Sequence, residues 1–309
     1  MRVVRKTLAD GTVKEYRYPR KAAAKPSRIT AGTLDALLAA YRRSPEWNAL
    51  RPASKATYTT YLRILDHRGD MRIEECTRRL LLDIRDAIVV KRGKGAANGF
   101  MNMAGSLFAW AVQREWIAIS PALNIKRLPG GHLRPWTEAE YARAMDALPE
   151  PYRRVVVLAA HTGQRRGDLC RLPWTAYDGR RIRLVQHKTG VPLVLPVHGD
   201  LKRELDAWKE QRDGLLILTP PRAGAWQPNH LSDRMKLELE KAGLPGINVH
   251  GLRKLAATRL AEAGCSIHEI CAMLGWTTLT MAQLYTRAAE QETLASAAVV
   301  RLETSRVKP

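Results

Sequence analysis

The sequence predicts a mainly α-helical protein with a small β-hairpin or sheet, built as a helical N-terminal domain and a mixed α+β C-terminal domain. Apolar residues recur at the helical period of about 3.6 over most of residues 30–120 and again after residue 136. Runs with a period of two are short and lie near the N-terminus and after Gly179. A basic segment rich in Pro and Gly, residues 125–135, separates the helical regions and is predicted to be a linker.

Length and composition favour a folded protein that binds a polyanion. The 309 residues suffice for about two domains. Lys and Arg number 51 against 30 Asp and Glu, a net charge of +21, and a hydrophobic content of 45% excludes a disordered basic tail. No apolar run approaches the ~18 residues of a membrane span, and the start lacks the apolar core of a secretory signal. We expect a cytoplasmic, nucleoid-associated protein.

Residues 1–28 form a basic arm, in which nine Lys and Arg accompany only Asp10 and Glu15 as acidic residues. Two short β-prone runs flank Asp10-Gly11, a dipeptide typical of tight turns, so a β-hairpin is predicted here. Two interpretations stay open: a solvated, partly ordered terminus, and an accessory arm that contacts DNA.

The segment 29–124 is predicted to fold as four short helices. Leu34–Tyr41 carries the apolar face of the first, Ser54 can cap the second, and Thr77 can cap the third. The fourth lies near residues 96–112. The polar faces are rich in Arg and Lys, so this bundle is suited to lie on a duplex.

The domain over residues 136–309 begins with a capping box formed by Thr137 and Glu140. After Gly179, two alternating stretches flank Thr189-Gly190 and predict a β-hairpin. Helical periodicity occupies the other parts of this domain: residues 137–148, 153–160, 201–208 and 229–301, with 292–302 as a short apolar tail helix.

Cysteine usage favours a reducing compartment. The four cysteines contain no CxxC pair and lie in helix-like sequence: Cys76, Cys170, Cys265 and Cys271. Buried free thiols are expected. No close Cys/His pairs have the spacing of zinc ligands, so we expect neither a metal nor another cofactor.

Two motifs suit the binding of an anion. In Thr162-Gly163-Gln164-Arg165, a Gly ahead of a helix start would present backbone N–H groups, and Arg165 would point at the same anion. Lys188 lies at the tip of the predicted hairpin. Each also has an ordinary explanation, as a surface Arg and a solvent-facing turn residue.

Two further motifs lie nearer the C-terminus. His250 and Arg253 are one turn apart on one face of an Ala-rich helix. Trp276 follows Leu274-Gly275, and Tyr285 lies nine positions after Trp276. A lone Tyr is more typical of a core or surface aromatic than of a nucleophile, so the order and spacing of all four motifs must decide.

This ordered set, TGxR, a hairpin Lys, HxLR, LGW and a Tyr nine residues later, resembles the tyrosine recombinase (phage integrase) family. The resemblance covers roughly residues 30–290, with its specific motifs in 160–287. It implies a helical core-binding (SAM-like) domain over 29–124 and a catalytic domain with a C-terminal helical tail over 136–309. The catalytic residues that it implies are Arg165, Lys188, His250, Arg253, Trp276 and Tyr285.

The resemblance also implies roles. The two arginines would chelate a phosphate, because guanidinium groups donate several hydrogen bonds and stay charged. Tyr285 would attack phosphorus once the cationic pocket favours its phenolate, since its ordinary pKa is ~10. Lys188 would protonate the leaving 5′-hydroxyl, His250 would act as acid, base or phosphate donor, and Trp276 would donate its N–H. Asp168, where the family usually has Glu, would brace the loop of the first arginine.

The implied function is that of a site-specific DNA recombinase or integrase with a 3′-phosphotyrosyl intermediate. The basic arm favours integration or excision of a phage or other mobile element. The implied partners are double-stranded DNA with specific recombination sites and a homotetramer on paired sites. A monomer off DNA and an accessory DNA-bending protein stay open, as does a tail that packs on its own domain or docks into a neighbouring protomer.

Three alternatives stay open. A Xer-like resolvase would use the same chemistry, as would a type IB topoisomerase, which would relax supercoils as a monomer. A non-catalytic DNA-binding regulator is disfavoured by the complete residue set, because a binder needs no nucleophile. The target sequence, the crossover spacing and the preference for integration or excision do not follow from the sequence.

Overall fold

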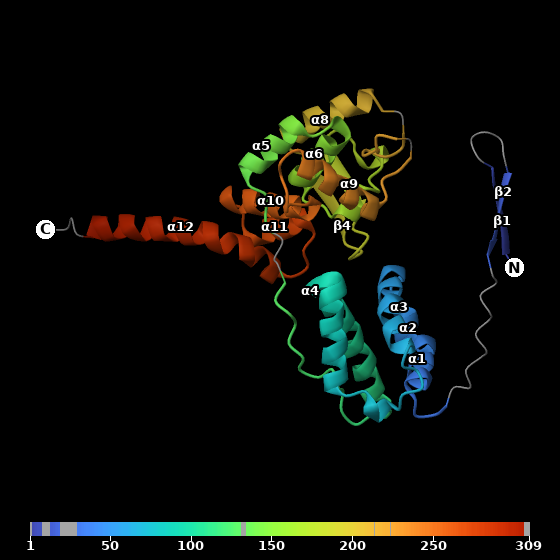
Figure 1. Ribbon diagram of the computed structural model, residues 1–309. Coiled ribbons are helices and arrows are strands. Elements are labelled where there is room, and N and C mark those ends of the chain that lie inside the picture. Colours follow the sequence, from blue (N-terminus) through green and yellow to red (C-terminus); the bar gives the residue numbers. More distant parts are fainter. Residues whose placement is uncertain are drawn as a thin grey trace. The chain divides into compact units, whose positions relative to one another are not determined.

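The computed structural model describes residues 2–7, 13–18, 30–130, 134–212, 214–222 and 224–305. The chain divides into two compact units, Met1–Gly131 and His132–Pro309. Helices dominate the described residues, whose strands form two antiparallel pairs (Figure 1). The predicted fold class, mainly α with a small sheet, is confirmed.

A β-hairpin precedes the helices of the N-terminal unit. Strand β1 (Arg2–Thr7) pairs antiparallel with β2 (Val13–Tyr18), with Val4 opposite Tyr16. The predicted turn at Asp10-Gly11 lies outside the described residues.

Four helices of the N-terminal unit pack around one apolar core. They are α1 (Leu34–Arg43), α2 (Pro45–Ala49), α3 (Pro52–Asp66) and α4 (Arg78–Gln113) (Figure 1). Thr77 caps α4 as predicted, with its hydroxyl accepting from the N–H of Leu80. Gly93 interrupts α4 with a φ of 80°, so the predicted third and fourth helices lie on either side of a kink. Leu62 and Phe100 are fully buried in the shared core.

The predicted start of the second helix is wrong. α3 begins at Pro52, with Arg51 as its N-cap residue, and Ser54 lies inside the first turn. Proline suits this position because its φ is already helical and the N–H that it lacks would have no helical partner. The short helix α2, capped by Ser44, was not predicted.

The C-terminal unit combines helices with one hairpin. Its elements are α5 (Glu138–Ala147), α6 (Glu150–Thr162), α7 (Arg166–Leu169), β3 (Arg181–Val185), β4 (Pro192–Pro196), α8 (Gly199–Glu210), α9 (Pro228–Lys241), α10 (Val249–Glu262), α11 (Ile267–Leu274) and α12 (Leu279–Ser305). The capping box of Thr137 and Glu140 is present at the start of α5. β3 pairs with β4 as predicted, with Ile182 opposite Leu195 and both buried.

Helix α6 forms the centre of the main core. It packs against α5, α7, α8 and α10, and Val155, Leu158 and Ala159 are fully buried. A smaller apolar cluster joins α10, α11 and α12, with Ala257, Ile270 and Ala282 among its buried members. The ends of α6 and α11 therefore lie beside the start of α10, which is where the candidate site forms.

The predicted separate tail helix over 292–302 is wrong, because this stretch continues α12, which runs from Leu279 to Ser305. No Pro or Gly interrupts the sequence between these ends, so nothing in the chain stops helix propagation.

The described cysteines are free thiols. Cys76, Cys170 and Cys271 are buried, as predicted, whereas Cys265 is half-buried. Among the described residues, no helix is both long and apolar enough to cross a membrane.

Candidate active site

Arg253 lies at the centre of the candidate site, in the first turns of α10, and only 3% of it is exposed. Its Nη1 donates to the carbonyl of Gly163 at 2.8 Å, and its Nη2 donates to the carbonyl of Leu274 at 2.9 Å. These carbonyls lie at the C-terminal ends of α6 and α11, where helical partners are lacking and the helix dipole is negative. Two helix ends thus compensate the buried guanidinium.

Two glycines in the left-handed conformation make this arrangement possible. Gly163 ends α6 with a φ of 62°, and Gly275 ends α11 with a φ of 64°. A Cβ on Gly163 would lie 2.1 Å from Cδ2 of Leu274, and a Cβ on Gly275 would lie 2.5 Å from Nε2 of Gln186. The prediction that Gly163 offers free N–H groups ahead of a helix is wrong, because its N–H ends α6 on the carbonyl of Ala159.

Arg165 is held by a hydrogen bond to the segment that follows β3. It is the half-buried N-cap residue of α7, and its Nη1 donates to Oε1 of Gln186, the residue after β3. Asp168 is buried, and its Oδ1 accepts from the backbone N–H of His187 at 2.8 Å. Asp168 therefore fastens the loop between β3 and β4, which carries Lys188.

His250 lies among positive charges. The pKa of its imidazole is lowered by partial burial and then by four neighbouring cations: Arg253, Lys254, Arg165 and Lys188. Each of these positive charges disfavours the imidazolium, so the neutral form of the ring is favoured. The ring is neutral at neutral pH and can accept a proton.

Trp276 and Tyr285 complete the cluster. Their rings stack with centroids 5.6 Å apart and planes 21° apart, and Cζ of Arg253 lies 5.4 Å from the centroid of Trp276. Burial raises the pKa of Tyr285, and Arg253 only partly opposes this. In the DNA-free protein desolvation therefore outweighs the nearby cation, and the phenol keeps its proton. The phenolate expected during the attack stays a prediction.

The charge of the site is suited to an anion. Burial, followed by repulsion from Arg165, lowers the pKa of Arg253 to about 10, whereas the charge of Asp168 opposes that shift. Arg253 still stays protonated at neutral pH. An anion placed between the two guanidinium groups would relieve their repulsion.

Residues 136–292 match the phage integrase family. This match covers half of the chain and contains all six candidate residues. This chain belongs to the phage integrase family of tyrosine-type site-specific recombinases.

This chain is similar in sequence to curated recombinases and similar in fold to solved integrase structures. Tyrosine recombinase XerC of Mycobacterium sp. (strain KMS) is 29% identical over 200 residues, covering 58% of this chain and 67% of XerC. A lambda integrase dimer bound to a COC′ core site has a TM-score of 0.71 at 24% identity, covering 82% of this chain and 77% of that chain. A lambda integrase tetramer bound to a Holliday junction has a TM-score of 0.71 at 22% identity, covering 89% of each chain.

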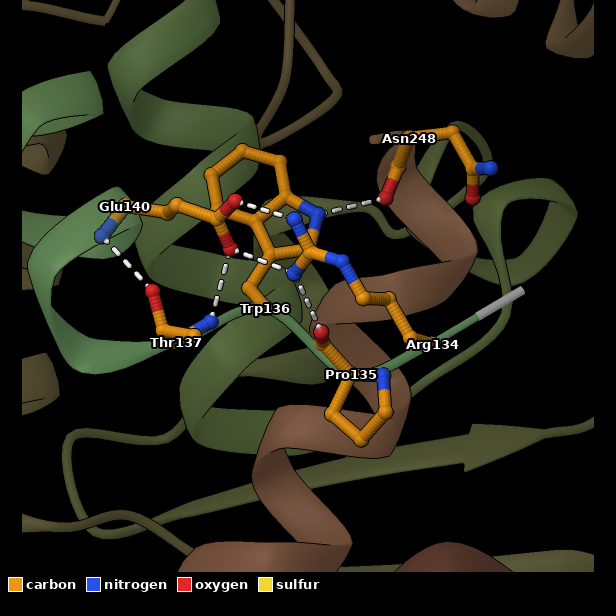
Figure 2. A network of polar contacts seen from close by, with 6 residues as sticks. All are labelled: Arg134, Pro135, Trp136, Thr137, Glu140 and Asn248. Atoms are coloured by element: carbon orange, nitrogen blue, oxygen red, sulfur yellow. Dashed lines mark hydrogen bonds and ion pairs between the residues drawn. The ribbon is translucent and has the colours of Figure 1, made fainter. Parts of the chain in front are cut away.

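The start of helix α10, which carries His250 and Arg253, is fixed by the segment that follows the predicted linker. Asn248 is the N-cap residue, and its Oδ1 accepts from the N–H groups of His250 and Gly251 at 3.0 and 3.3 Å. Figure 2 shows the indole of Trp136 donating to the carbonyl of Asn248, at 2.8 Å. A Cβ on Gly251 would lie 2.6 Å from Trp136. The first segment of the C-terminal unit is thus hydrogen-bonded to the turn that carries His250.

Figure 2 also shows how the polar groups of this entry segment are paired. The Glu140 carboxylate accepts from the Arg134 guanidinium and from the N–H of Thr137, so the capping box and an ion pair share one acid. The ion pair and these hydrogen bonds hold the pKa of Glu140 down, at about 2.

Sequence reasoning missed the uncharged members of the site: Gln164, Gln186, Asn248 and Trp136. Neither glutamine carries a titratable group to attract attention. The available signal was position, since Gln164 precedes Arg165 directly and Gln186 lies two residues before Lys188.

Proposed function

We propose that this recombinase cleaves and rejoins double-stranded DNA at specific sites through a 3′-phosphotyrosyl intermediate formed by Tyr285. The observation that carries the proposal is the packing of the Tyr285–Trp276 ring stack beside the buried guanidinium of Arg253. This packing provides a hydroxyl nucleophile and a cation for phosphate in one place.

The scissile phosphate is assigned to the two arginines. A guanidinium has five N–H donors. In the described residues Arg253 uses two of them, on Gly163 and Leu274, and Arg165 uses one, on Gln186. The others are available for the non-bridging oxygens of a pentacoordinate transition state. Each preorganised donor of this kind is typically worth ~3–4 kcal/mol.

Proton transfers follow from the charges of the site. Tyr285 is protonated and must lose its proton during the attack, and neutral His250 is the assigned base. Lys188 is the assigned acid for the leaving 5′-oxygen, since its loop is exposed. Trp276 orients the nucleophile through the stacked rings and offers its indole N–H to the phosphate.

The bonds balance without a cofactor. The bond from Tyr285 Oη to phosphorus forms as the bond to the 5′-oxygen breaks, so one phosphodiester replaces another of similar energy. A 5′-hydroxyl from the same or another strand can then attack the phosphotyrosine and release Tyr285. Exchange of that hydroxyl converts cleavage into recombination.

Strand exchange between two duplexes needs four active sites, so the proposed assembly is a homotetramer on paired sites. The lambda integrase tetramer on a Holliday junction supports this arrangement. The apolar side chains of Val299, Val300 and Leu302 are exposed near the end of α12, which favours docking of this tail into a neighbouring protomer. The protein would act in the cytoplasm, at the nucleoid.

Integration or excision of a phage or other mobile element is the proposed role, supported by the likeness to lambda integrase and by the basic residues 1–28. Resolution in the manner of XerC is the second candidate, favoured by the sequence relatives. Deletion of residues 1–28 should spare cleavage of a core site and impair complete integration. Unchanged integration would remove the role of the arm and favour the second candidate.

Covalent trapping tests the chemistry. A duplex nicked beside the scissile phosphate loses its short fragment after the attack, so the adduct persists through denaturing electrophoresis. The wild type and the control Tyr152→Phe should form the adduct, whereas Tyr285→Phe should bind the duplex and form none. An adduct with Tyr285→Phe would show that the nucleophile is misassigned. If the wild type forms no adduct on its own site, a non-catalytic DNA-binding regulator is favoured. If it relaxes supercoiled DNA without paired sites, a type IB topoisomerase is favoured.

A further inference from the structure

The side chain of Gln186 joins most parts of the candidate site. It has no exposed surface. Its Nε2 donates to the carbonyl of Leu274 and to Oε1 of Gln164, each at 2.8 Å. Its Oε1 accepts from Nη1 of Arg165 and, at 2.8 Å, from the hydroxyl of Thr189.

This amide is fully used and cannot move without loss. A Gln side chain has two N–H donors and one oxygen with two lone pairs, and all four have partners here. A buried network in which every member is satisfied is rigid. The backbone of Gly275 closes one side, since a Cβ there would lie 2.5 Å from Nε2.

The partners of Gln186 connect it to both arginines and to the lysine loop. The carbonyl of Leu274 accepts from Gln186 and also from Arg253. Thr189 follows Lys188 directly, and the turn closes on the backbone of Gln186, whose carbonyl accepts from Gly190 at 2.7 Å. One neutral side chain is therefore hydrogen-bonded to Arg165 and to the lysine loop and shares an acceptor with Arg253.

We propose that Gln186 is a positioning residue, which aims Arg165 and the Lys188 loop at the same phosphate that Arg253 binds. This inference rests on the function proposed above. The residue type matters: an amide oxygen orients the Arg165 guanidinium and leaves its full charge for the phosphate. A carboxylate in the same place would orient it and neutralise it. Gln164 supports the arrangement, since its Nε2 donates to the carbonyls of Thr162 and Met273 at 3.0 and 3.2 Å.

Two variants of similar size test the role of the amide. Gln186→Met removes all four hydrogen bonds, and Gln186→Glu keeps an acceptor for Arg165 but adds charge. Gln211→Met, at the exposed end of α8, is the matched control. The adduct is measured in single turnover on the nicked duplex at saturating protein, together with duplex affinity and unfolding temperature. We expect both Gln186 variants to react about 10- to 100-fold slower, the range of a reacting group misplaced by ~1 Å, with affinity within about threefold.

A double-variant cycle shows whether Gln186 acts through Arg165. If it does, Gln186→Met should slow an Arg165→Lys protein far less than it slows the wild type, because the side chain that it orients is already changed. A purely structural defect would instead multiply with Arg165→Lys.

Each outcome decides one proposal. The inference is overturned by a folded Gln186→Met protein with the wild-type rate, or by rate losses that simply multiply with Arg165→Lys. Should Gln186→Met not fold, the isosteric Gln186→Glu decides in the same way. A wild type without a Tyr285-dependent adduct would contradict the proposed function instead, and the two failures are therefore distinguishable.

Discussion

The two units bury polar side chains for different purposes. In the N-terminal unit they complete the backbone: Thr33 and Ser44 cap helices, and the Asn98 amide pairs with the backbone of Leu128. In the C-terminal unit, buried polar side chains gather around one guanidinium: Gln164, Asp168, Gln186 and Arg253.

This difference predicts whether the loss of a buried polar group lowers stability alone or also slows the reaction. A side chain that completes a helix end contributes stability of about 1 kcal/mol and has no chemistry to disturb. Around Arg253 the polar groups bind one another and the ends of helices, so a change redirects charge. The C-terminal unit even leaves Oδ2 of Asp168 buried without a hydrogen-bond partner among the described residues. Its carboxylate offsets the charge of Arg253 instead.

The largest predicted effect is the loss of the central guanidinium. Arg253→Met should slow adduct formation by about a thousandfold or more, since it removes several donors to the transition state at once. The matched control is Arg259→Met on the same helix, where the guanidinium binds Glu138 near the surface. Single-turnover trapping checks both. Equal rates for the two variants would contradict the central place of Arg253.

The next effect concerns the pH dependence of His250. Its pKa lies below the ordinary 6.5, so the imidazole is neutral at pH 7 and becomes protonated only as the pH falls further. The wild-type rate should therefore be flat near neutral pH and fall in acid. His250→Gln should be slower by about a hundredfold and lack this acid decline. The exposed His268→Gln serves as control, and an acid decline that persists in His250→Gln would assign it to another group.

A glycine variant tests the close packing of the Gly275 backbone against the Gln186 amide. Gly275→Ala places a Cβ against the Gln186 amide, whereas Gly264→Ala meets nothing within 4 Å, although Gly264 has a similar φ of +80°. Both should lose about 1–2 kcal/mol of stability from the left-handed backbone. Only Gly275→Ala should also react about tenfold slower, through a displaced amide. Reaction rates and unfolding temperatures of both variants separate backbone strain from the steric clash with the Gln186 amide. Equal rates for the two variants would show that the amide tolerates displacement.

Local patterns made much of the fold predictable. The capping box at Thr137, the cap at Thr77 and the β3–β4 hairpin each depend on residues within a few positions of one another. The start of α3 was mispredicted because Pro52 and Ser54 both suit a helix start, and proline prevailed. The tail was mispredicted because the apolar stretch 292–302 was interpreted as a helix of its own, whereas it is the last part of α12.

The site was less predictable because its bonds span the chain. Family motifs pointed to the charged and aromatic residues, but Gln186 bonds residues 22 and 88 positions away. Gly163, two residues before Arg165, suggests a helix start. In the folded chain it ends α6 instead, and its carbonyl accepts a hydrogen bond from Arg253. The raised pKa of Tyr285 follows from burial, which depends on how α12 packs.

The smallest effect on chemistry should come from the N-terminal unit. Asn98 is buried, and its amide both donates to and accepts from the backbone of Leu128, each at 2.9 Å. Asn98→Ala leaves that backbone without partners and should cost about 1–3 kcal/mol of stability. The exposed Asn102→Ala on the same helix should cost far less.

At saturating protein, the rate of adduct formation should be the same for Asn98→Ala, Asn102→Ala and the wild type. The N-terminal amide fastens a segment of backbone and has no reacting group to aim, whereas Gln186 holds a guanidinium. A slowed rate in Asn98→Ala at full duplex occupancy would mean that buried polar groups of the N-terminal unit also govern the chemistry. The contrast between the two units would then be one of degree.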